Sequence, residues 1–292
     1  MNRTINNCDT SKRCSARVSP FSPRSLAILS VCALLLLLPV HASSQEGDTL
    51  FTRLLEAIRS GQQIESVHRY YDWSLYFDAD QLRLLRNAIY ARHGYAFRSN
   101  DLDTFFRQYE WYKPKPGAPV SLTDTDTGNL RMIQRMEVYT ALKVQAESIQ
   151  VDLPFSHQTY VGLWQDSPLV ASGYGHTYSF FSNGAVVERT NEMDGQRRLI
   201  SQVGEWSIEN GFMYIRHTHR IYLYGGELVK SSGSIASPKM LVNAEIKFEK
   251  HMDYRRVSIG PIDTREEFGM TMNSFEMDGL RWYRVGPEPT YY

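Results

Sequence analysis

The apolar positions of this chain follow a helical period in its first half and an alternating period in its second half. Leu82, Leu85 and Ile89 have the spacing of one face of an α-helix. Beyond about residue 157, apolar and polar residues alternate, as in strands with one buried face. The pattern therefore predicts an α+β protein, with a small all-helical module at residues 48–150. An antiparallel β-meander at residues 157–286, in the form of a barrel or a sandwich, is expected to follow.

The clearest predicted helix contains residues 80–92. Asp78 suits its N-cap, and Gly94 can adopt the left-handed conformation that commonly ends a helix. Other helices are expected from Leu50 to about Gly61, from residue 102 to 108 and from residue 126 to 148. The core-facing positions of the last helix are expected to be Leu130, Ile133, Met136, Thr140 and Val144.

The second half is expected to contain nine strands and one short helix. Ser182-Asn183-Gly184 is a hairpin-turn signal between two of the strands. Asp263 could cap a short helix within residues 261–272. The strands are expected at residues 160–164, 176–181, 184–190, 197–208, 212–218, 220–224, 240–249, 254–259 and 280–285.

Residues 1–42 have the three parts of a secretory signal peptide. Five basic residues precede the apolar run Leu26–Leu38, and Pro39–Ala42 then supplies a cleavage position, so cleavage is expected after Ala42. A retained membrane anchor is the alternative, but the run is shorter than the ~20 residues that a span needs. Lipidation is not expected, because Cys32 lies inside the run instead of after it.

Cleavage would change the charge and the cysteine content. Residues 1–42 hold five of the 32 basic residues and one of the 32 acidic residues, so the mature chain would have 27 basic and 31 acidic residues, a net charge of −4. A general nucleic-acid-binding protein would have a basic excess instead. Cys8, Cys14 and Cys32 all precede the cut, so the mature chain is expected to have no disulfide and no thiolate site.

The region from Gln81 to Glu137 contains a specific motif. Its central part is Leu-Arg-Asn-Ala-Ile-Tyr-Ala-Arg-His-Gly-Tyr-Ala-Phe at residues 85–97, followed by Trp-Tyr-Lys-Pro at residues 111–114. A trailing segment with Leu122, Asp126 and Asn129 follows. This region resembles the YARHG domain of bacterial exported or envelope proteins, named after the sequence at residues 90–94. The resemblance implies an extracytoplasmic helical module of unknown biochemical role, with no catalytic residue.

The second half has a weaker resemblance. Short aromatic motifs at residues 162–164, 178–180, 204–208 and 213–215 are similar to those of small bacterial lipocalin-like barrels. This resemblance implies an interior that binds a small apolar molecule.

Five polar residues of the predicted helix 80–92 are candidate binding residues for an acidic or glycan group of the envelope. On a helical wheel, three of them lie beside the apolar stripe. The alternative is that they cap the helix and bind acidic residues of the same module, at Asp101, Asp103 or Asp126. The five are Arg86, Asn87, Tyr90, Arg92 and His93.

Other chemistry has less support. His217 and His219 would lie on one face of a strand, near His176, His251 or Asp253, but spacing fixes no third zinc ligand, so no metal and no cofactor is predicted. The chain has no Gly-x-Ser-x-Gly or His-Glu-x-x-His motif. We therefore expect a non-catalytic, periplasmic or secreted envelope protein, with no stable membrane span after signal cleavage. A binding protein for a small apolar ligand is the first alternative, and a cell-wall glycan hydrolase, which a spatial pair of carboxylates would reveal, is the second.

Overall fold

The computed structural model describes residues 39–64, 77–169, 175–191, 194–231 and 237–291. The chain forms two compact units, Met1–Glu46 and Gly47–Tyr292. The apolar run of the predicted signal peptide lies outside the described residues.

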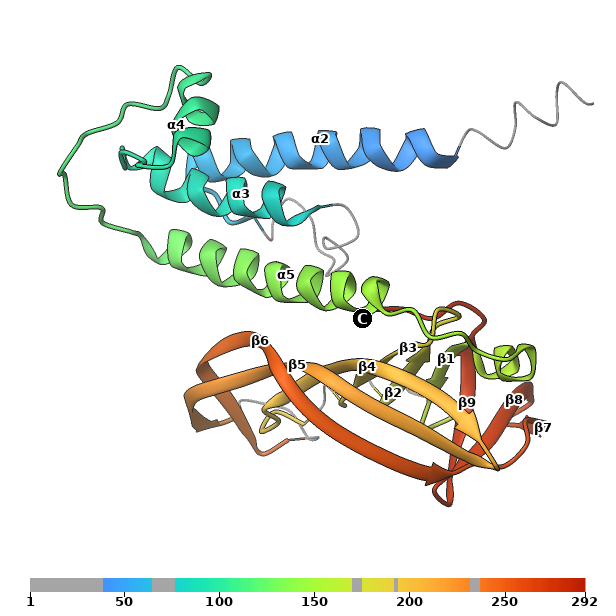
Figure 1. Cartoon of the computed structure of the whole chain (residues 1–292). Coiled ribbons are helices and arrows are strands. Elements are labelled where there is room, and N and C mark those ends of the chain that lie inside the picture. The colour runs from blue at the N-terminus through green and yellow to red at the C-terminus, as the bar shows by residue number, and fades with distance from the viewer. Residues whose placement is uncertain (1–38, 65–76, 170–174, 192–193, 232–236, 292) are drawn as a thin grey trace, which may run out of the picture. The chain divides into compact units, whose positions relative to one another are not determined.

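The described helices are followed by a β-rich region, which confirms the α+β prediction (Figure 1). The first described helix already includes Pro39, so it extends further toward the N-terminus than the predicted start at Leu50. The helices are α2 (Pro39–Ser60), α3 (Ala79–Arg92), α4 (Asn100–Arg107) and α5 (Asp124–Ser148), with a 3₁₀ helix, η3, at Phe155–Tyr160. No helix in the described part of the chain is long and apolar enough to span a membrane.

Helix α3 begins and ends as its sequence predicts. Asp78 Oδ1 accepts a hydrogen bond from the Gln81 amide at 2.8 Å, and the Gln81 side chain accepts one from the Asp78 amide at 3.1 Å, which together form a capping box. Gly94 ends the helix with a φ of +80°. Its carbonyl accepts a hydrogen bond from the Lys115 amide at 2.8 Å, so the long connection after α4 returns to the end of α3.

Helix α5 buries two opposite faces in two different cores. Ile133 and Met136 pack with residues of α2, α3 and α4. Tyr139, Leu142 and Ala146 pack on the sheet instead, against a cluster that contains Ala185, Val187, Ile200, Val203 and Ile221. The prediction that Val144 faces the core is wrong, since this side chain is 57% exposed. It was placed by continuing the stripe of Ile133, whereas the second half of α5 is buried on the other side of the helix.

Nine strands in the described residues form one antiparallel sheet, in the order β6-β5-β4-β3-β2-β1-β9-β8-β7. The sheet is not closed, because β6 and β7 remain its edges, although an isolated bridge pairs Ile259, just after β6, with Met277 of β8. The strands are β1 (Gly162–Gln165), β2 (Thr177–Phe180), β3 (Ala185–Arg189), β4 (Leu199–Glu209), β5 (Phe212–Lys230), β6 (Lys239–Ser258), β7 (Asp263–Glu267), β8 (Met270–Met277) and β9 (Leu280–Gly286).

Two details of the predicted strands change. The pairs predicted at 212–218 with 220–224 and at 240–249 with 254–259 are each one long strand, β5 and β6. The short helix predicted within residues 261–272 is wrong, because this segment is the β7–β8 hairpin. Asp263 accepts a hydrogen bond from Ser274 Oγ at 2.6 Å instead of capping a helix. Phe268 and Gly269 form the turn, with φ values of +54° and +75°.

The sheet face opposite α5 carries a second, aromatic core. Neighbouring residues of β3 show the two faces, since Val187 packs on the α5 side and Val186 on the aromatic side. Trp164 meets Phe275 with ring centroids 4.7 Å apart, and Phe180 meets Trp206 at 5.0 Å. All four rings are buried, so they fill this part of the face that was expected to line a ligand-binding interior.

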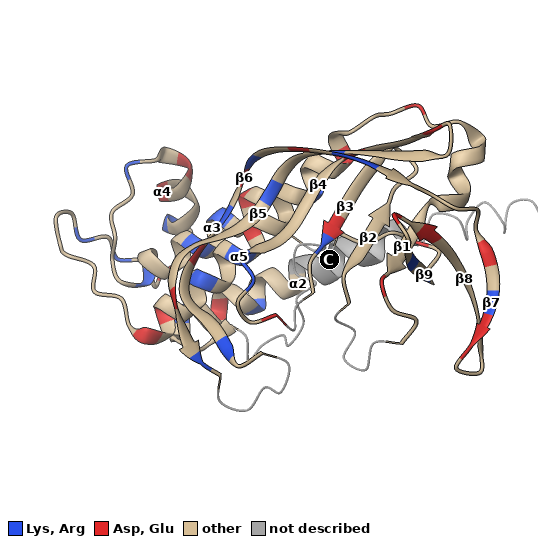
Figure 2. Cartoon of the chain, turned by 90° about the horizontal axis from the view of Figure 1, so that it is seen from below, with Lys and Arg blue, Asp and Glu red and all other residues tan. Residues whose placement is uncertain are grey.

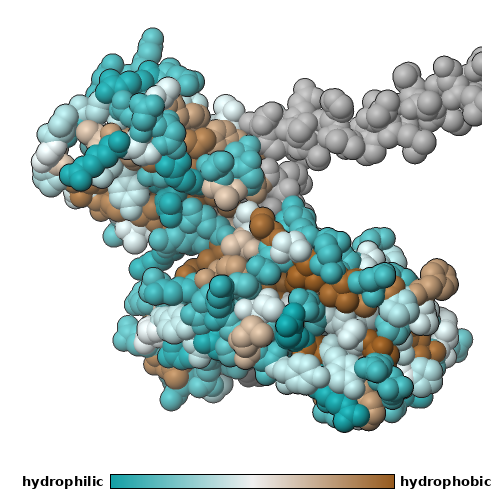
Figure 3. All heavy atoms as spheres, in the orientation of Figure 1, coloured by the Kyte–Doolittle hydropathy of each residue, from teal (hydrophilic) through white to brown (hydrophobic). Residues whose placement is uncertain are grey.

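In Figure 2, acidic and basic residues are interspersed along the described helices and strands. The visible surface in Figure 3 is mostly hydrophilic, and hydrophobic residues gather around the line where α5 meets the sheet. At this boundary, the α5 side chains Tyr139, Leu142 and Ala146 are buried against the sheet.

Candidate functional site

A polar cluster around the buried carboxylate of Glu188 lies on the aromatic side of the sheet. We call it the Glu188 cluster and define it as Glu188, His176, His217, Arg255 and Tyr178. Glu188 Oε1 accepts hydrogen bonds from His176 Nε2 at 2.9 Å and from Arg255 Nη1 at 3.1 Å. The same guanidinium nitrogen donates to the Tyr178 hydroxyl at 3.1 Å. His217 Nε2 lies 3.2 Å from Glu188 Oε2, but it is not aligned for a hydrogen bond.

Adjacent strands place these side chains together. Register pairs Tyr178 of β2 with Glu188 of β3, and His217 of β5 with Asp253 of β6. Glu188 follows Val186 by two residues and therefore faces the same side as the aromatic core. The Glu188 side chain is only 3% exposed, so its carboxylate is buried beside the aromatic core.

The surroundings shift the pKa values of the cluster in different directions. Burial alone would raise the pKa of Glu188, but the hydrogen bond from His176 and the charges of His217 and Arg255 lower it to about 2. Burial lowers the pKa of His217 below its ordinary value, despite the nearby Glu188. Burial, with help from the charge of Glu188, raises the pKa of Tyr178. Glu188 therefore remains ionised at neutral pH, and His217 remains neutral.

The two histidines weighed as a metal pair do not share a face. A β-bulge between His217 and His219 shifts the register of β5 against both neighbouring strands. His217 consequently contacts Glu188, whereas His219 stacks on Phe248 at a centroid distance of 5.1 Å, on the α5 side. The expectation of two imidazoles on one face is wrong for this reason. Within the described ranges, no group of three or more His, Cys, Asp and Glu residues is arranged to hold a metal ion.

The Glu188 cluster was not predicted from the sequence. His176, His217 and Asp253 were candidate metal ligands, but Glu188 and Arg255 were not among the candidates. Strict alternation in β3 would have found Glu188, because it places this residue on the same face as Val186. The partnership with Arg255 depends on the pairing of distant strands, which spacing within one strand does not reveal.

A second buried carboxylate lies at the start of α5. Asp126 is fully buried and accepts four hydrogen bonds. Two come from Thr123, from its amide at 2.9 Å and from its hydroxyl at 2.8 Å. The others come from Arg92 Nη1 at 3.0 Å and from His93 Nε2 at 2.8 Å. We call this group of Arg92, His93, Thr123 and Asp126 the Asp126 junction.

The Asp126 junction connects three helix ends. Arg92 Nη1 also donates to the carbonyl of Ile58 in the last turn of α2, at 3.2 Å. A Cβ atom at Gly61, just after α2, would lie 2.8 Å from Arg92 Nη2, so glycine leaves room for the guanidinium there. His93 is the C-cap of α3, and Thr123 is the N-cap of α5. The junction therefore holds the end of α2, the end of α3 and the start of α5 together.

Hydrogen bonding decides the charge state of Asp126. Burial by itself would raise the pKa of this carboxyl, but the hydrogen bonds from Thr123 and His93 and the positive charge of Arg92 lower it below the ordinary value. The carboxylate is therefore ionised at neutral pH and forms an ion pair with Arg92.

The other three candidate residues of α3 have separate contacts. Arg86 Nη1 lies 3.2 Å from Glu137 Oε2 on α5, Asn87 Nδ2 donates to the carbonyl of Arg83 at 2.8 Å, and the Tyr90 ring meets the Tyr95 ring edge-on. The structure thus brings Arg92 and His93 together at one carboxylate, but it does not gather all five candidates at one place. Of the acidic partners considered for them, Asp126 is the one that Arg92 and His93 contact. Asp101 pairs with Arg83 and Asp103 with Arg107.

Residues 73–138 match the model of the YARHG domain. The matched region contains α3, α4 and the first part of α5, and therefore the whole Asp126 junction. The YARHG domain is usually found in extracellular proteins. The comparisons found no curated protein and no solved structure that matches the chain.

The motif that names the YARHG domain has a structural explanation in this chain. Its arginine, Arg92, binds Asp126 and the end of α2, its histidine, His93, binds Asp126, and its glycine, Gly94, ends α3. Its tyrosine, Tyr90, meets Tyr95 beyond the helix end, and Tyr95 meets Phe97 at a centroid distance of 5.1 Å. The side chains of Tyr90, Arg92 and His93 thus contact other residues of this chain, and Gly94 acts through its backbone conformation.

Proposed function

We propose that the protein is a non-catalytic component of the extracytoplasmic space, periplasmic or secreted, in which the YARHG module is a structural and interaction unit for the β domain. The observation that carries the proposal is the Asp126 junction. The polar residues of the motif form contacts within this chain, as expected of residues that stabilise the fold. Helix α5 extends from this junction to the sheet, so that the module supports the β domain directly.

Two features support an extracytoplasmic location. Residues 1–42 have the order of parts typical of a secretory signal peptide. The YARHG match points to the same side of the membrane. The structural role fits a mature chain without cysteine, whose stability must come from packing and polar contacts alone.

The location is tested by fractionating cells that make the protein from its own signal sequence. We expect the protein in the periplasmic or secreted fraction, with an N-terminus at Ser43 when the intact mass is measured. A variant with Leu34→Arg and Leu36→Arg should remain uncleaved in the cytoplasm, because charge interrupts the apolar run. Uncleaved wild-type protein in the cytoplasm would contradict the proposal.

The role of the motif is tested by substituting Arg86 and His93 separately. The structural role predicts that His93→Ala lowers the melting temperature, because it removes a hydrogen bond to the buried Asp126. Arg86→Ala should have a smaller effect, since Arg86 is a partly exposed partner of Glu137. If either variant keeps its melting temperature but is lost from the envelope fraction, the residue binds a partner instead.

The alternative of a lipocalin-like interior has less support. The aromatic face of the sheet is occupied by packed rings, among them Trp164, Phe180, Trp206 and Phe275. A small-ligand site on the other side of the sheet is therefore the better candidate.

A further inference from the structure

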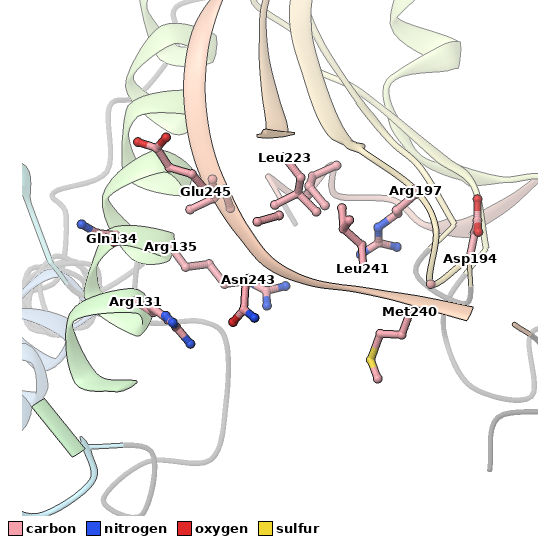
Figure 4. A pocket seen from close by; sticks show the side chains of 14 residues that line it. Arg131, Gln134, Arg135, Asp194, Arg197, Leu223, Met240, Leu241, Asn243 and Glu245 are labelled. Carbon is pink, nitrogen blue, oxygen red and sulfur yellow. The ribbon is translucent and has the colours of Figure 1, made fainter. Parts of the chain in front are cut away.

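A cavity of about 580 Å³ lies between α5 and the sheet (Figure 4). Its volume falls in the range of small-molecule sites in proteins, roughly 300–1,000 Å³. The walls come from three places in the sequence. Helix α5 contributes Arg131, Gln134 and Arg135, the segment before β4 contributes residues around Asp194, and strands β4, β5 and β6 contribute the rest.

The inner wall of the cavity is apolar. Ile200 of β4, Leu223 of β5 and Leu241 and Ile246 of β6 line it. Ile200 belongs to the core between α5 and the sheet, with Leu223 and Ile246 packed against it, so this wall is continuous with that core. An aliphatic chain placed there would extend an existing apolar surface, and removal of its own apolar area from water would favour binding.

The backbone on the side opposite α5 is held in place. The Leu241 amide donates a hydrogen bond to the Gly195 carbonyl at 2.7 Å. A Cβ atom at Gly195 would lie 2.6 Å from the carbonyl oxygen of Lys239, so the close approach of these two segments requires glycine. The wall is thus built by specific contacts between the start of β6 and the segment before β4.

The rim of the cavity is more basic than acidic. Arg131 and Arg135 are four residues apart and therefore neighbours on one side of α5. Arg197 reaches toward the cavity from the side opposite α5, as Figure 4 shows. The two acidic rim residues have local contacts, since Glu245 pairs with Lys247 at 3.0 Å and Asp194 accepts a hydrogen bond from the Gln196 amide at 3.0 Å.

From this juxtaposition we propose that the cavity binds an amphiphilic anion, an aliphatic chain with a carboxylate or phosphate head. Guanidinium groups present parallel N–H donors that match both heads, and they lose less hydration energy than ammonium groups do. The apolar wall would receive the chain, and the arginines of α5 and Arg197 would receive the head. The site lies on the α5 side of the sheet and is separate from the Glu188 cluster.

The proposal is tested by calorimetric titration of the purified protein with octanoate, octyl phosphate and 1-octanol. Acetate and inorganic phosphate are the controls, because they carry the same head groups without the aliphatic chain. We expect octanoate or octyl phosphate to bind at least about tenfold more tightly than 1-octanol and than either head alone, because head and chain both contribute. Comparison of octanoate with octyl phosphate identifies the preferred head.

Variants locate the binding. Arg131→Gln, on an exposed part of α5, should weaken binding of the anion by about tenfold and leave 1-octanol unchanged. Arg107→Gln removes the same charge from α4 and is the matched control that should bind normally. Leu241→Asn should weaken binding of every ligand with an octyl chain, because a polar side chain replaces part of the apolar wall. Three results would each overturn the proposal. They are equal affinities for 1-octanol and octanoate, a loss of anion affinity in Arg107→Gln as large as in Arg131→Gln, and no binding of octanoate or octyl phosphate at millimolar concentration.

Discussion

At the scale of single residues, two buried carboxylates are the centres of the Asp126 junction and the Glu188 cluster. Asp126 and Glu188 are both almost fully enclosed, and both remain ionised because cations and hydrogen-bond donors surround them. Such groups gain little net stability over an apolar alternative, but loss of one partner is costly, because the remaining charge stays buried. Substitution at either position should therefore have a large effect.

Asp126→Asn should destabilise the protein by about 3 kcal/mol, because an amide cannot replace the charge that Arg92 and His93 face. Asp124→Asn is the matched control. Asp124 is an exposed acid in the same first turn of α5, and its loss should cost less than about 0.5 kcal/mol. Urea unfolding followed by circular dichroism measures both. Equal effects would show that the Asp126 junction contributes no more than the helix dipole.

Glu188 predicts a dependence of stability on pH. Its pKa is about 2 in the folded protein, against an ordinary value of 4.5, so its contribution is complete above pH 4.5 and is lost as the pH falls toward 2. The lowered pKa of His217 acts in the same direction, because protonation of this buried ring at acidic pH opposes folding. Acidification should therefore destabilise the fold.

Glu188→Gln should lower the free energy of unfolding by about 3 kcal/mol at pH 7, and this difference from wild type should shrink steadily below pH 4.5. Glu205→Gln, which removes the partly exposed partner of Arg216, is the control with a small effect. Urea midpoints at pH 7, 5 and 3.5 provide the comparison. A difference that is constant over this range would mean that the charge of Glu188 does not stabilise the folded state.

At the scale of elements, helix ends could be predicted from the sequence, but long-range strand geometry could not. Asp78 and Gly94 act through groups within a few residues, so local sequence is sufficient to place α3. The bulge between His217 and His219 arises from pairing with two neighbouring strands, and no local signal marks it. The β7–β8 turn was missed because a phenylalanine, Phe268, occupies a positive-φ position that normally favours glycine or asparagine.

Two glycines of the helical module should respond in opposite ways to alanine. Gly94→Ala should destabilise by about 1–2 kcal/mol, because φ is +80° and the new Cβ would lie 3.0 Å from the Lys113 carbonyl oxygen. Gly128→Ala should stabilise by up to about 1 kcal/mol, because Gly128 lies inside α5 and nothing lies within 4 Å of an added Cβ. Thermal unfolding of both variants tests the pair. A stabilising Gly94→Ala would contradict the role of Gly94 as the helix terminator.

At the scale of the whole molecule, the order of helices and strands followed from the change of period, but the way in which α5 joins them did not. A helical wheel assumes one buried face, whereas α5 presents Ile133 to the helices and Leu142 to the sheet. The Glu188 cluster and the cavity were missed for a similar reason. Their residues meet only through the tertiary arrangement, and each is ordinary in its own segment.

This arrangement of α5 predicts that the helices and the sheet unfold together. Leu142→Ala should destabilise by about 3 kcal/mol, because the side chain is fully buried between α5 and the sheet. Val144→Ala, two residues away and largely exposed, should change stability by less than about 0.5 kcal/mol. Hydrogen exchange measured by mass spectrometry in rising urea can follow peptides of α3 and β3 separately. If α5 couples the two parts, Leu142→Ala moves both midpoints by the same amount, whereas a shift of the β3 peptides alone would show that the YARHG module is stable without the sheet.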